Sequence, residues 1–258
     1  MRTSIYGGWA VVAGASEGLG VAFATALAAG GSNLVLLARR ADRLASVADE
    51  LRARHGVEVR TAACDLGRPD LADELAAHTR GLDVGVAVYN AAFAPVGPFV
   101  ERPLDDLLRV VDVNVRGPLV FARTFAPAMI QRGRGALVLM SSLAGFQGSP
   151  RLATYAATKA FNTILGEGLW SELRPHGVDV VVSCAGAIRT PGYARTAGGD
   201  APGTLDGDVV AEETLAALGR GPTVVPGATN KVARFVLGRV LPQRASIAIM
   251  GRSTKGLS

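Results

Sequence analysis

Short apolar runs recur along the chain, and stretches with helical periodicity follow them. The runs of strand length span residues 9–14, 33–39, 57–64, 84–90, 136–142, 178–184 and 223–226. Most are near-continuous runs of Val, Leu and Ala rather than strict alternations, which indicates strands buried on both faces. Strands that alternate with helices predict βαβ units and therefore a parallel sheet. The expected fold class is α/β, with a doubly wound, seven-stranded parallel sheet flanked by helices on both faces.

The alternation continues without a linker, so we expect a single domain over residues 1–258. Residues 187–215 open with a stretch rich in Gly, Pro and Thr that lacks periodicity, and they predict a mobile substrate loop. Residues 228–258 predict a C-terminal helical tail of two short basic amphipathic helices, split near Pro242. This tail could cover the substrate site, form a subunit interface or touch an anionic membrane surface. Packing against the domain or a partner subunit is the more ordinary role.

The composition is typical of a folded protein without a membrane span. Of the 258 residues, 49% are hydrophobic and 19% are charged, which provides enough apolar surface to offset the entropy lost on folding. No apolar run reaches the ~18 residues that a membrane-spanning helix needs. The N-terminal sequence does not resemble a signal peptide. We therefore expect a soluble, cytoplasmic protein with no transmembrane segment.

The net charge of +5 comes from arginines spread along the whole chain. All but three of the 27 basic residues are Arg, and they form no dense block. Diffuse basicity favours anionic ligands such as phosphorylated cofactors, but it does not predict nucleic-acid binding.

The cysteines and histidines do not form a pattern with chemical meaning. Cys64 and Cys184 are far apart, and the three histidines are isolated. Neither a metal site nor a disulfide framework is expected from such spacing. Free, buried thiols in a reducing compartment are the favoured interpretation.

The first strand is followed directly by the segment GASEGLG, residues 14–20, and then by a helix. Glycines at 14, 18 and 20 let the backbone turn tightly and approach a phosphate closely. The helix N-terminus supplies unpaired N–H groups and a favourable dipole for the anion. These features predict a nucleotide-binding turn, and the alternative is a tight strand-to-helix turn without a ligand.

The end of the second strand bears on the type of nucleotide. A carboxylate about 20 residues after the glycines would accept hydrogen bonds from the ribose of NAD. Here the strand ends in Ala38-Arg39-Arg40, and guanidinium groups bind a 2′-phosphate well. The sequence therefore favours NADP(H) over NAD(H), chiefly through Arg39. The alternative is that both arginines are the solvated start of the next helix.

A tyrosine and a lysine lie four residues apart near the start of a long helical pattern. Tyr155 and Lys159 share one helical face, and a nearby ammonium lowers a tyrosine pKa towards values that suit acid–base catalysis. Lys159 is one of only three lysines, and Ser142 ends a buried strand 13 residues before Tyr155. A surface cation–tyrosine pair is the alternative for the tyrosine and lysine alone.

Six motifs together resemble the classical short-chain dehydrogenase/reductase family. They are GASEGLG (14–20), CDL (64–66), YNAA (89–92), VDVNVRG (111–117), SSLAG (141–145) and YAATK (155–159). Their order and spacing match the family over about residues 1–227. The resemblance implies a Rossmann-like fold, NAD(P)-dependent hydride transfer and a homodimer or homotetramer.

The resemblance also implies a role for each site residue. Tyr155 would be the general acid or base, and Ser142 would bind the substrate oxygen. Lys159 would hold the nicotinamide ribose and lower the Tyr155 pKa, and Asn114 would position a water in the proton relay. Cofactor contacts are expected at Gly14, Ser16, Glu17, Gly18, Leu19, Gly20, Arg39, Arg40, Asp65, Leu66, Asn90, Ala91, Tyr155, Lys159, Gly186, Ile188 and Thr190.

The chain departs from the family pattern at three places. Tyr89 and Ala92 flank Asn90-Ala91 where the family has Asn and Gly, and Ala185 replaces a Pro. Glu17 lies where NADP-preferring members often carry a basic residue.

The expected function is an NADP(H)-dependent oxidoreductase acting on a carbonyl or secondary alcohol, with an apolar ketone, ketoacyl or steroid-like substrate. Pocket candidates are Phe93, Val96, Leu143, Phe146 and Tyr193, and the alternative of equal weight is that several of them seal loops against the core. The alternative is a non-catalytic NADP(H)-binding sensor or scaffold.

Overall fold

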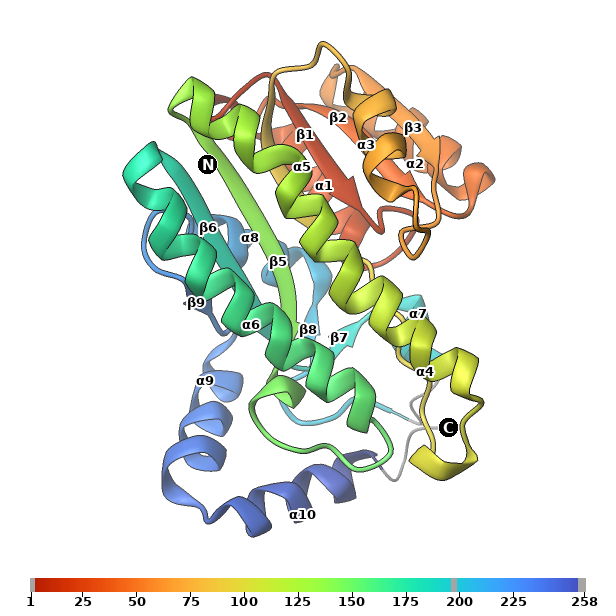
Figure 1. The fold of residues 1–258 in the computed structure, drawn as a ribbon, viewed down its shortest axis with the longest axis vertical. Coiled ribbons are helices and arrows are strands. Elements are labelled where there is room, and N and C mark those ends of the chain that lie inside the picture. The colour runs from red at the N-terminus through yellow and green to blue at the C-terminus, as the bar shows by residue number, and fades with distance from the viewer. Residues whose placement is uncertain (1–2, 196–198, 255–258) are drawn as a thin grey trace.

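The computed structural model of the protein describes residues 3–195 and 199–254. Its centre is a seven-stranded sheet in the order β3-β2-β1-β4-β5-β6-β9, and every pair of neighbours is parallel (Figure 1). The strands are β1 Trp9–Ala13, β2 Asn33–Ala38, β3 Val59–Ala63, β4 Val84–Tyr89, β5 Gly135–Ser142, β6 Val178–Ala185 and β9 Thr223–Val224. This order confirms the predicted doubly wound fold. Its switch point lies between β1 and β4, where ligands of such sheets bind at the carboxyl ends of the strands.

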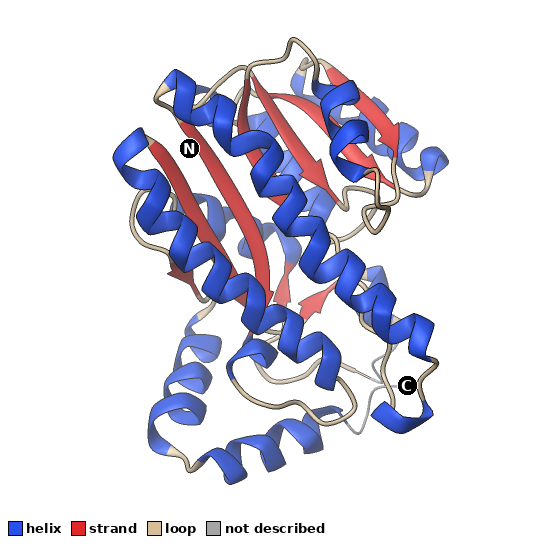
Figure 2. Cartoon of the chain, in the orientation of Figure 1, coloured by secondary structure: helices blue, strands red, loops and turns tan. Residues whose placement is uncertain are grey.

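Helices cover both faces of the sheet (Figure 2). Those packed on one face are α1 Leu19–Ala29, α2 Ala41–His55 and α8 Gly207–Ala216. Those packed on the other face are α3 Leu71–Thr79, α5 Gly117–Arg132 and α6 Ala153–Leu173, with α4 Leu104–Val111 preceding α5. The 3-10 turns are η1 Thr3–Ile5, η2 Phe99–Glu101, η4 Leu143–Phe146 and η5 Arg174–His176, and η3 Asp112–Arg116 is a π turn.

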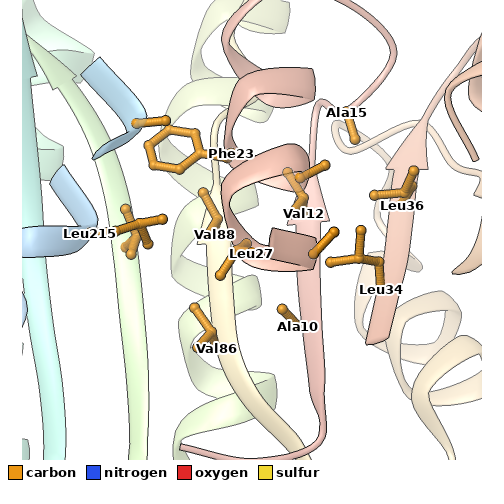
Figure 3. Packing of buried hydrophobic residues seen from close by; sticks show 14 of the residues in the cluster. Ala10, Val12, Ala15, Phe23, Leu27, Leu34, Leu36, Val86, Val88 and Leu215 are labelled. Atoms are coloured by element: carbon orange, nitrogen blue, oxygen red, sulfur yellow. The ribbon is translucent and has the colours of Figure 1, made fainter. Parts of the chain in front are cut away.

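Side chains of α1 form the centre of one core. Phe23 and Leu27 of this helix lie against Val12 and Val88 of the central strands, and all four are fully buried (Figure 3). Complete burial of one such side chain contributes roughly 1.5–3 kcal/mol to the free energy of unfolding. Because α1 begins at the cofactor turn, this packing fixes the position of that turn on the sheet.

The segment after β6 has more regular structure than the sequence predicts. Within it, β7 Ile188–Arg189 pairs with β8 Leu205–Asp206, and a short helix, α7 Pro191–Ala194, lies between them. The Arg189 guanidinium donates to Asp200 at 2.6 Å and to Asp206 at 2.7 Å, which joins the two ends of the segment. The described part of this segment therefore contains short regular elements, and its mobility and its role as a substrate loop stay predictions. Residues 196–198 lie outside the described residues.

The C-terminal segment forms two helices, as the sequence predicts. They are α9 Ala228–Phe235, which continues into a π turn, η6 Val236–Val240, and α10 Gln243–Thr254. We call residues 228–254 the C-terminal arm. In Figure 1 the arm extends beyond the carboxyl end of β5 and turns at the break before α10. Residues 255–258 lie outside the described residues.

Candidate active site

Three of the predicted catalytic residues converge at the carboxyl end of β5. Ser142 is the last residue of that strand, while Tyr155 and Lys159 lie in the first two turns of α6. The Lys159 ammonium nitrogen is 5.4 Å from the centre of the Tyr155 ring, and the Ser142 side chain forms a hydrogen bond with the Tyr155 hydroxyl. The strand and the helix thus bring together a proton donor, a hydrogen-bond donor and a cation.

Burial shapes the acidity of this group. It raises the pKa of Tyr155, and the hydrogen bond with Ser142 opposes that rise. Burial also lowers the pKa of Lys159 to about 8, since a charged ammonium loses hydration there. The sequence predicts a lowered Tyr155 pKa from the lysine charge alone. The structure differs because the largest effect on the Tyr155 pKa is the cost of burying a phenolate.

The end of β5 also fixes Lys159 itself. Its ammonium donates to the Met140 carbonyl at 3.0 Å, and its own carbonyl accepts from the Ser141 hydroxyl at 2.7 Å. Ser141 is also 2.8 Å from the Thr163 hydroxyl one turn further along α6. Ser141 and Thr163 are positioning residues that the sequence analysis did not find, although Ser141 lies inside the SSLAG motif.

Asn114 occupies η3, the π turn between α4 and α5. Its side-chain oxygen accepts from the Phe93 amide at 2.8 Å, and its nitrogen donates to the Phe93 carbonyl at 2.9 Å and to the Thr158 hydroxyl at 3.2 Å. The fully buried amide therefore ties the segment after β4 to α6. Its side chain holds the site together, and the water-positioning role that the resemblance implies stays a prediction.

The glycines of the cofactor turn let its backbone pass close to two other segments. Gly14 has a φ of +84°, and a Cβ there would lie 2.8 Å from the Ala91 Cα. Gly18 has a φ of +58°, and a Cβ there would lie 2.8 Å from a Thr190 methyl carbon. Gly18 caps α1 without a side-chain hydrogen bond, so the first N–H groups of the helix remain available to an anion. This cradle fits the diphosphate of a nicotinamide cofactor.

A charged cluster lies beside this turn. Arg40 donates to the Ser16 hydroxyl at 3.1 Å and pairs with Glu17 at 3.0 Å. Arg195, which follows α7, pairs with the same Glu17 carboxylate at 2.9 Å. Both guanidinium groups lower the Glu17 pKa, Arg195 the more strongly, so the carboxylate stays ionised. Arg39 is exposed, and it acts on Asp65 only through longer-range attraction.

The residues expected near the adenine and on β4 are largely engaged with the protein. Asp65 pairs with Arg109 of α4 at 2.9 Å and accepts from the Gly67 amide at 3.1 Å. Asn90 donates to the Gly14 carbonyl at 3.0 Å, which joins β4 to the cofactor turn. Arg109 was missed because nothing in its local sequence signals a partner 44 residues away.

The far side of the site is formed by residues after β6. A Cβ at Gly186 would lie 2.7 Å from the side-chain oxygen of Asn230, a buried residue of α9. Asn230 donates to the carbonyls of Gly203 and Pro226 at 3.1 and 3.0 Å, which links the arm to the substrate segment. The sequence analysis missed Asn230, whose partners are brought together only by the fold.

Of the other expected cofactor contacts, Leu19 and Gly20 begin α1, Leu66 follows β3 and Ile188 begins β7. Of the pocket candidates, Phe146 packs beneath the Arg234 guanidinium, which is 3.6 Å from its ring centre. The Tyr193 hydroxyl donates to the Gly199 carbonyl at 3.2 Å. The Tyr193 side chain thus ties a loop together, whereas Phe146 also lines a groove of about 430 Å³ with residues of α6 and Ile247 of α10.

The described residues contain neither a membrane-spanning helix nor a cluster of metal ligands. In the ranges 3–195 and 199–254 no helix combines the length and apolar character needed to cross a bilayer. In the same ranges no three His, Cys, Asp or Glu side chains gather as metal ligands would. Cys64 and Cys184 are both buried and unpaired, as predicted.

The chain is similar to known reductases and dehydrogenases. The family model described as short chain dehydrogenase matches residues 8–198. A very-long-chain 3-oxoacyl-CoA reductase of Aspergillus clavatus is 41% identical over 179 residues, which are 67% of this chain and 52% of that protein. A 7beta-hydroxysteroid dehydrogenase of Collinsella aerofaciens is 32% identical over 232 residues, 88% of each chain. The chain thus spans about half the length of the Aspergillus curated relatives it matches.

Solved structures show the same similarity. A structure from a study of 7beta-hydroxysteroid dehydrogenase stereoselectivity has a TM-score of 0.91 at 30% identity, covering 97% of this chain and 99% of that one. A short-chain dehydrogenase from Sphingobium yanoikuyae in complex with NADPH has a TM-score of 0.77 at 32% identity, covering 84% and 86%. The high coverage of the first structure extends the similarity to the C-terminal arm.

Proposed function

The chain belongs to the short chain dehydrogenase family, and on that premise we propose that it is an NADP(H)-dependent oxidoreductase. It interconverts a carbonyl group and a secondary alcohol. The observation that carries this proposal is the convergence of Ser142, Tyr155 and Lys159 at the carboxyl end of β5. A non-catalytic sensor or scaffold would have no need for a buried lysine beside a tyrosine, because burying the ammonium is costly.

The residues of the chain divide the work of carbonyl reduction among them. When bound, nicotinamide supplies the hydride that adds to the carbonyl carbon. Ser142 donates a hydrogen bond to the carbonyl oxygen and stabilises the negative charge that develops there. Tyr155 transfers its hydroxyl proton to that oxygen, which completes the alcohol, and the Lys159 ammonium stabilises the phenolate that remains. In the oxidation of an alcohol the same groups act in reverse.

NADP(H) is the proposed cofactor because positive charge surrounds the cofactor turn. Arg40 already contacts Ser16 of that turn, and Arg39 follows the same strand. Glu17, which by itself would repel a 2′-phosphate, is neutralised by two guanidinium groups. A net positive cluster therefore remains for the phosphate. The Sphingobium relative in complex with NADPH supports the same choice.

The proposed substrates are apolar ketones, 3-oxoacyl thioesters and keto steroids. The names of the relatives, a 3-oxoacyl-CoA reductase and a hydroxysteroid dehydrogenase, support the second and the third of these classes. We also propose that residues 1–258 form one domain and that the protein is a cytoplasmic homodimer or homotetramer, as is common in the family.

Replacement of Tyr155 by Phe tests the catalytic proposal. Because the variant lacks only the transferable proton, we expect NADPH-dependent reduction of 3-oxoacyl and keto-steroid substrates to fall about 100- to 10,000-fold. Calorimetric titration should show that NADPH still binds. Unchanged turnover would contradict the assignment of Tyr155. Cofactor binding without turnover of any carbonyl compound by the wild type would favour a sensor or scaffold.

A further inference from the structure

The C-terminal end of the chain concentrates the positive charge of the protein. Residues 214–258 contain seven Lys or Arg and no Asp or Glu. Residues 1–213 contain 20 basic and 22 acidic residues, so without the last segment the net charge would be −2 instead of +5. The basic residues are thus spread along the whole chain, but the net positive charge comes from residues 214–258.

The C-terminal arm also exposes large apolar side chains next to these cations. Val232, Phe235 and Val240 are 63%, 62% and 60% exposed, and Ile249 of α10 is 40% exposed. Lys231, Val232 and Phe235 lie at positions i, i+1 and i+4, which places them on one face of α9.

Three arginines of the arm form no ion pair with a carboxylate of the described residues. Among the ion pairs of residues 3–195 and 199–254, none includes Arg239, Arg244 or Arg252, and all three are exposed. Lys231 is 3.5 Å from Glu213, and Arg234 is turned inward onto Phe146. Most of the positive charge of the arm is therefore directed to solvent, beside the exposed apolar side chains.

The arm is attached to the body of the protein by several contacts. Arg234 packs on Phe146, Asn230 bonds to Gly203, and the Thr254 hydroxyl donates to the Pro150 carbonyl at 2.9 Å. Within the arm, the Ser246 hydroxyl donates to the Leu237 carbonyl at 2.7 Å, which fixes the angle between α9 and α10. The exposed face is therefore a defined surface of the molecule.

We propose that the C-terminal arm docks the protein on the surface of a bilayer that contains anionic lipids. Val232, Phe235, Val240 and Ile249 enter the headgroup region, while the arginines contact lipid phosphates. An amphipathic segment with apolar residues beside Lys and Arg has the chemistry that binds such an interface. The arm lies on the surface and does not span the membrane.

Charge complementarity favours a lipid surface over a second copy of this chain. In a two-fold symmetric contact the same patch meets itself, so an arm-to-arm contact would place cations opposite cations. An anionic bilayer instead neutralises the arginines and covers the apolar side chains in one step.

Docking through the arm would also orient the active site. The arm contacts residues 146–150, which follow Ser142 in the chain, and Gly203 of the substrate segment (Figure 1). The opening between these segments would then lie near the bilayer, where apolar carbonyl compounds partition. This consequence rests on the proposed function, whereas the docking itself does not.

Co-sedimentation of the full chain with vesicles tests the docking. We expect binding to vesicles of phosphatidylcholine with phosphatidylglycerol, little binding to phosphatidylcholine alone, and loss of binding between about 0.1 and 1 M salt. The triple variant Arg239→Gln, Arg244→Gln, Arg252→Gln should bind about 100-fold more weakly, since each charge contributes about fivefold. Phe235→Ser should weaken binding roughly tenfold.

Matched variants outside the arm test whether a loss of vesicle binding comes from the arm itself or from a general loss of charge or apolar surface. Arg43→Gln, Arg54→Gln, Arg123→Gln removes the same charge from exposed positions elsewhere, and Phe99→Ser removes a phenyl group that is 59% exposed. Both controls should bind anionic vesicles like the wild type.

The proposal is overturned if the wild type does not bind anionic vesicles, or if both triple variants lose binding equally. It is also overturned if Phe235→Ser turns a dimer into a monomer in light scattering without any effect on vesicle binding, because a second copy would then cover the arm. The assay uses neither cofactor nor substrate, so its failure is distinguishable from failure of the proposed oxidoreductase activity.

Discussion

At the scale of single residues, the candidate site contains one side chain, Lys159, whose burial lowers the free energy of unfolding. Lys159 is 97% buried, and its ammonium has one hydrogen-bond acceptor in the described structure, the Met140 carbonyl. Its pKa of about 8 is below the ordinary 10.5 because the charged form is disfavoured there. A group of this kind is retained for its chemistry, since an apolar residue of similar length would be easier to bury.

Replacement of Lys159 by Met should therefore stabilise the cofactor-free protein at pH 7 by about 1–3 kcal/mol while abolishing turnover. Between pH 8 and pH 10.5 the unfolded wild-type chain binds more protons at Lys159 than the folded chain does, so the stability penalty of the lysine falls as the pH rises. The gain from Lys159→Met should shrink over that range. Urea unfolding of the wild type and the variant at pH 7 and pH 10 measures this gain in the free energy of unfolding. A gain that is the same at both pH values would contradict the role of charge burial.

A second residue-scale feature is a tyrosine that fits only beside a glycine. The Tyr89 hydroxyl donates to the Val113 carbonyl at 2.6 Å, just before Asn114 in the π turn. A Cβ at Gly117 would lie 2.0 Å from that hydroxyl oxygen and 3.0 Å from the Leu66 carbonyl. Tyr89, which departs from the family pattern, therefore fits at its position because residue 117 is a glycine.

Replacement of Tyr89 by Phe should cost about 1–3 kcal/mol in the free energy of unfolding, because the buried Val113 carbonyl loses its donor. Gly117→Ala should cost a similar amount or more by overpacking. Because most of the second cost is the clash with the hydroxyl, the double variant should be more stable than the sum of the single effects allows. A double-mutant cycle in urea measures this coupling, and strict additivity would show that the two residues are independent.

At the scale of elements, the cofactor turn is joined to the substrate segment through one carboxylate. Glu17 pairs with Arg40 after β2 and with Arg195 after α7, so elements on both sides of the cofactor opening meet there. The pairs are about one third to three fifths exposed, and such pairs contribute little to stability. Their importance is in placing guanidinium groups beside the turn.

Replacement of Arg40 by Ala should weaken NADPH binding about 10- to 100-fold, because a charge-assisted contact to the 2′-phosphate is lost. NADH binding should change little, since NADH lacks that phosphate. Arg43→Ala, three residues along α2 and also exposed, is the matched control and should bind NADPH normally. Parallel calorimetric titrations of both nucleotides measure the change, and equal losses for NADPH and NADH would contradict the phosphate contact.

At the scale of the whole molecule, the cofactor should act as a stabilising partner. Its proposed site spans β1, β2, β4, α6 and the segment after β6, so a bound nucleotide joins both halves of the sheet. A ligand at about 100 times its dissociation constant adds about 2.7 kcal/mol to the free energy of unfolding.

For a chain of this size, NADPH at that concentration should raise Tm by about 5–10 °C. NADH at the same concentration should raise it less, because the Arg40 cluster has no phosphate to bind. Thermal unfolding followed by circular dichroism measures both shifts. A larger shift with NADH would reverse the proposed cofactor preference.

The sequence by itself determined the sheet, the order of its elements along the chain and the candidate residues that meet at the end of β5. Near-continuous apolar strands must be buried on both faces, and a parallel sheet with helices on both sides buries them in this way. The glycine turn and the Tyr155–Lys159 pair were predictable because each is local, with all its residues within one turn of backbone. The break in the C-terminal arm at Pro242 was predictable for the same reason.

Only the tertiary structure decided which residues that are far apart in the chain contact one another. Arg109 meets Asp65 across 44 residues, Arg195 meets Glu17 across 178, and Asn230 reaches Gly203 from the arm. It also decided that burial raises the Tyr155 pKa against the local effect of the lysine. Solvation and charge pairing depend on which segments pack together, and a linear pattern carries no distance between residues that are far apart in the chain.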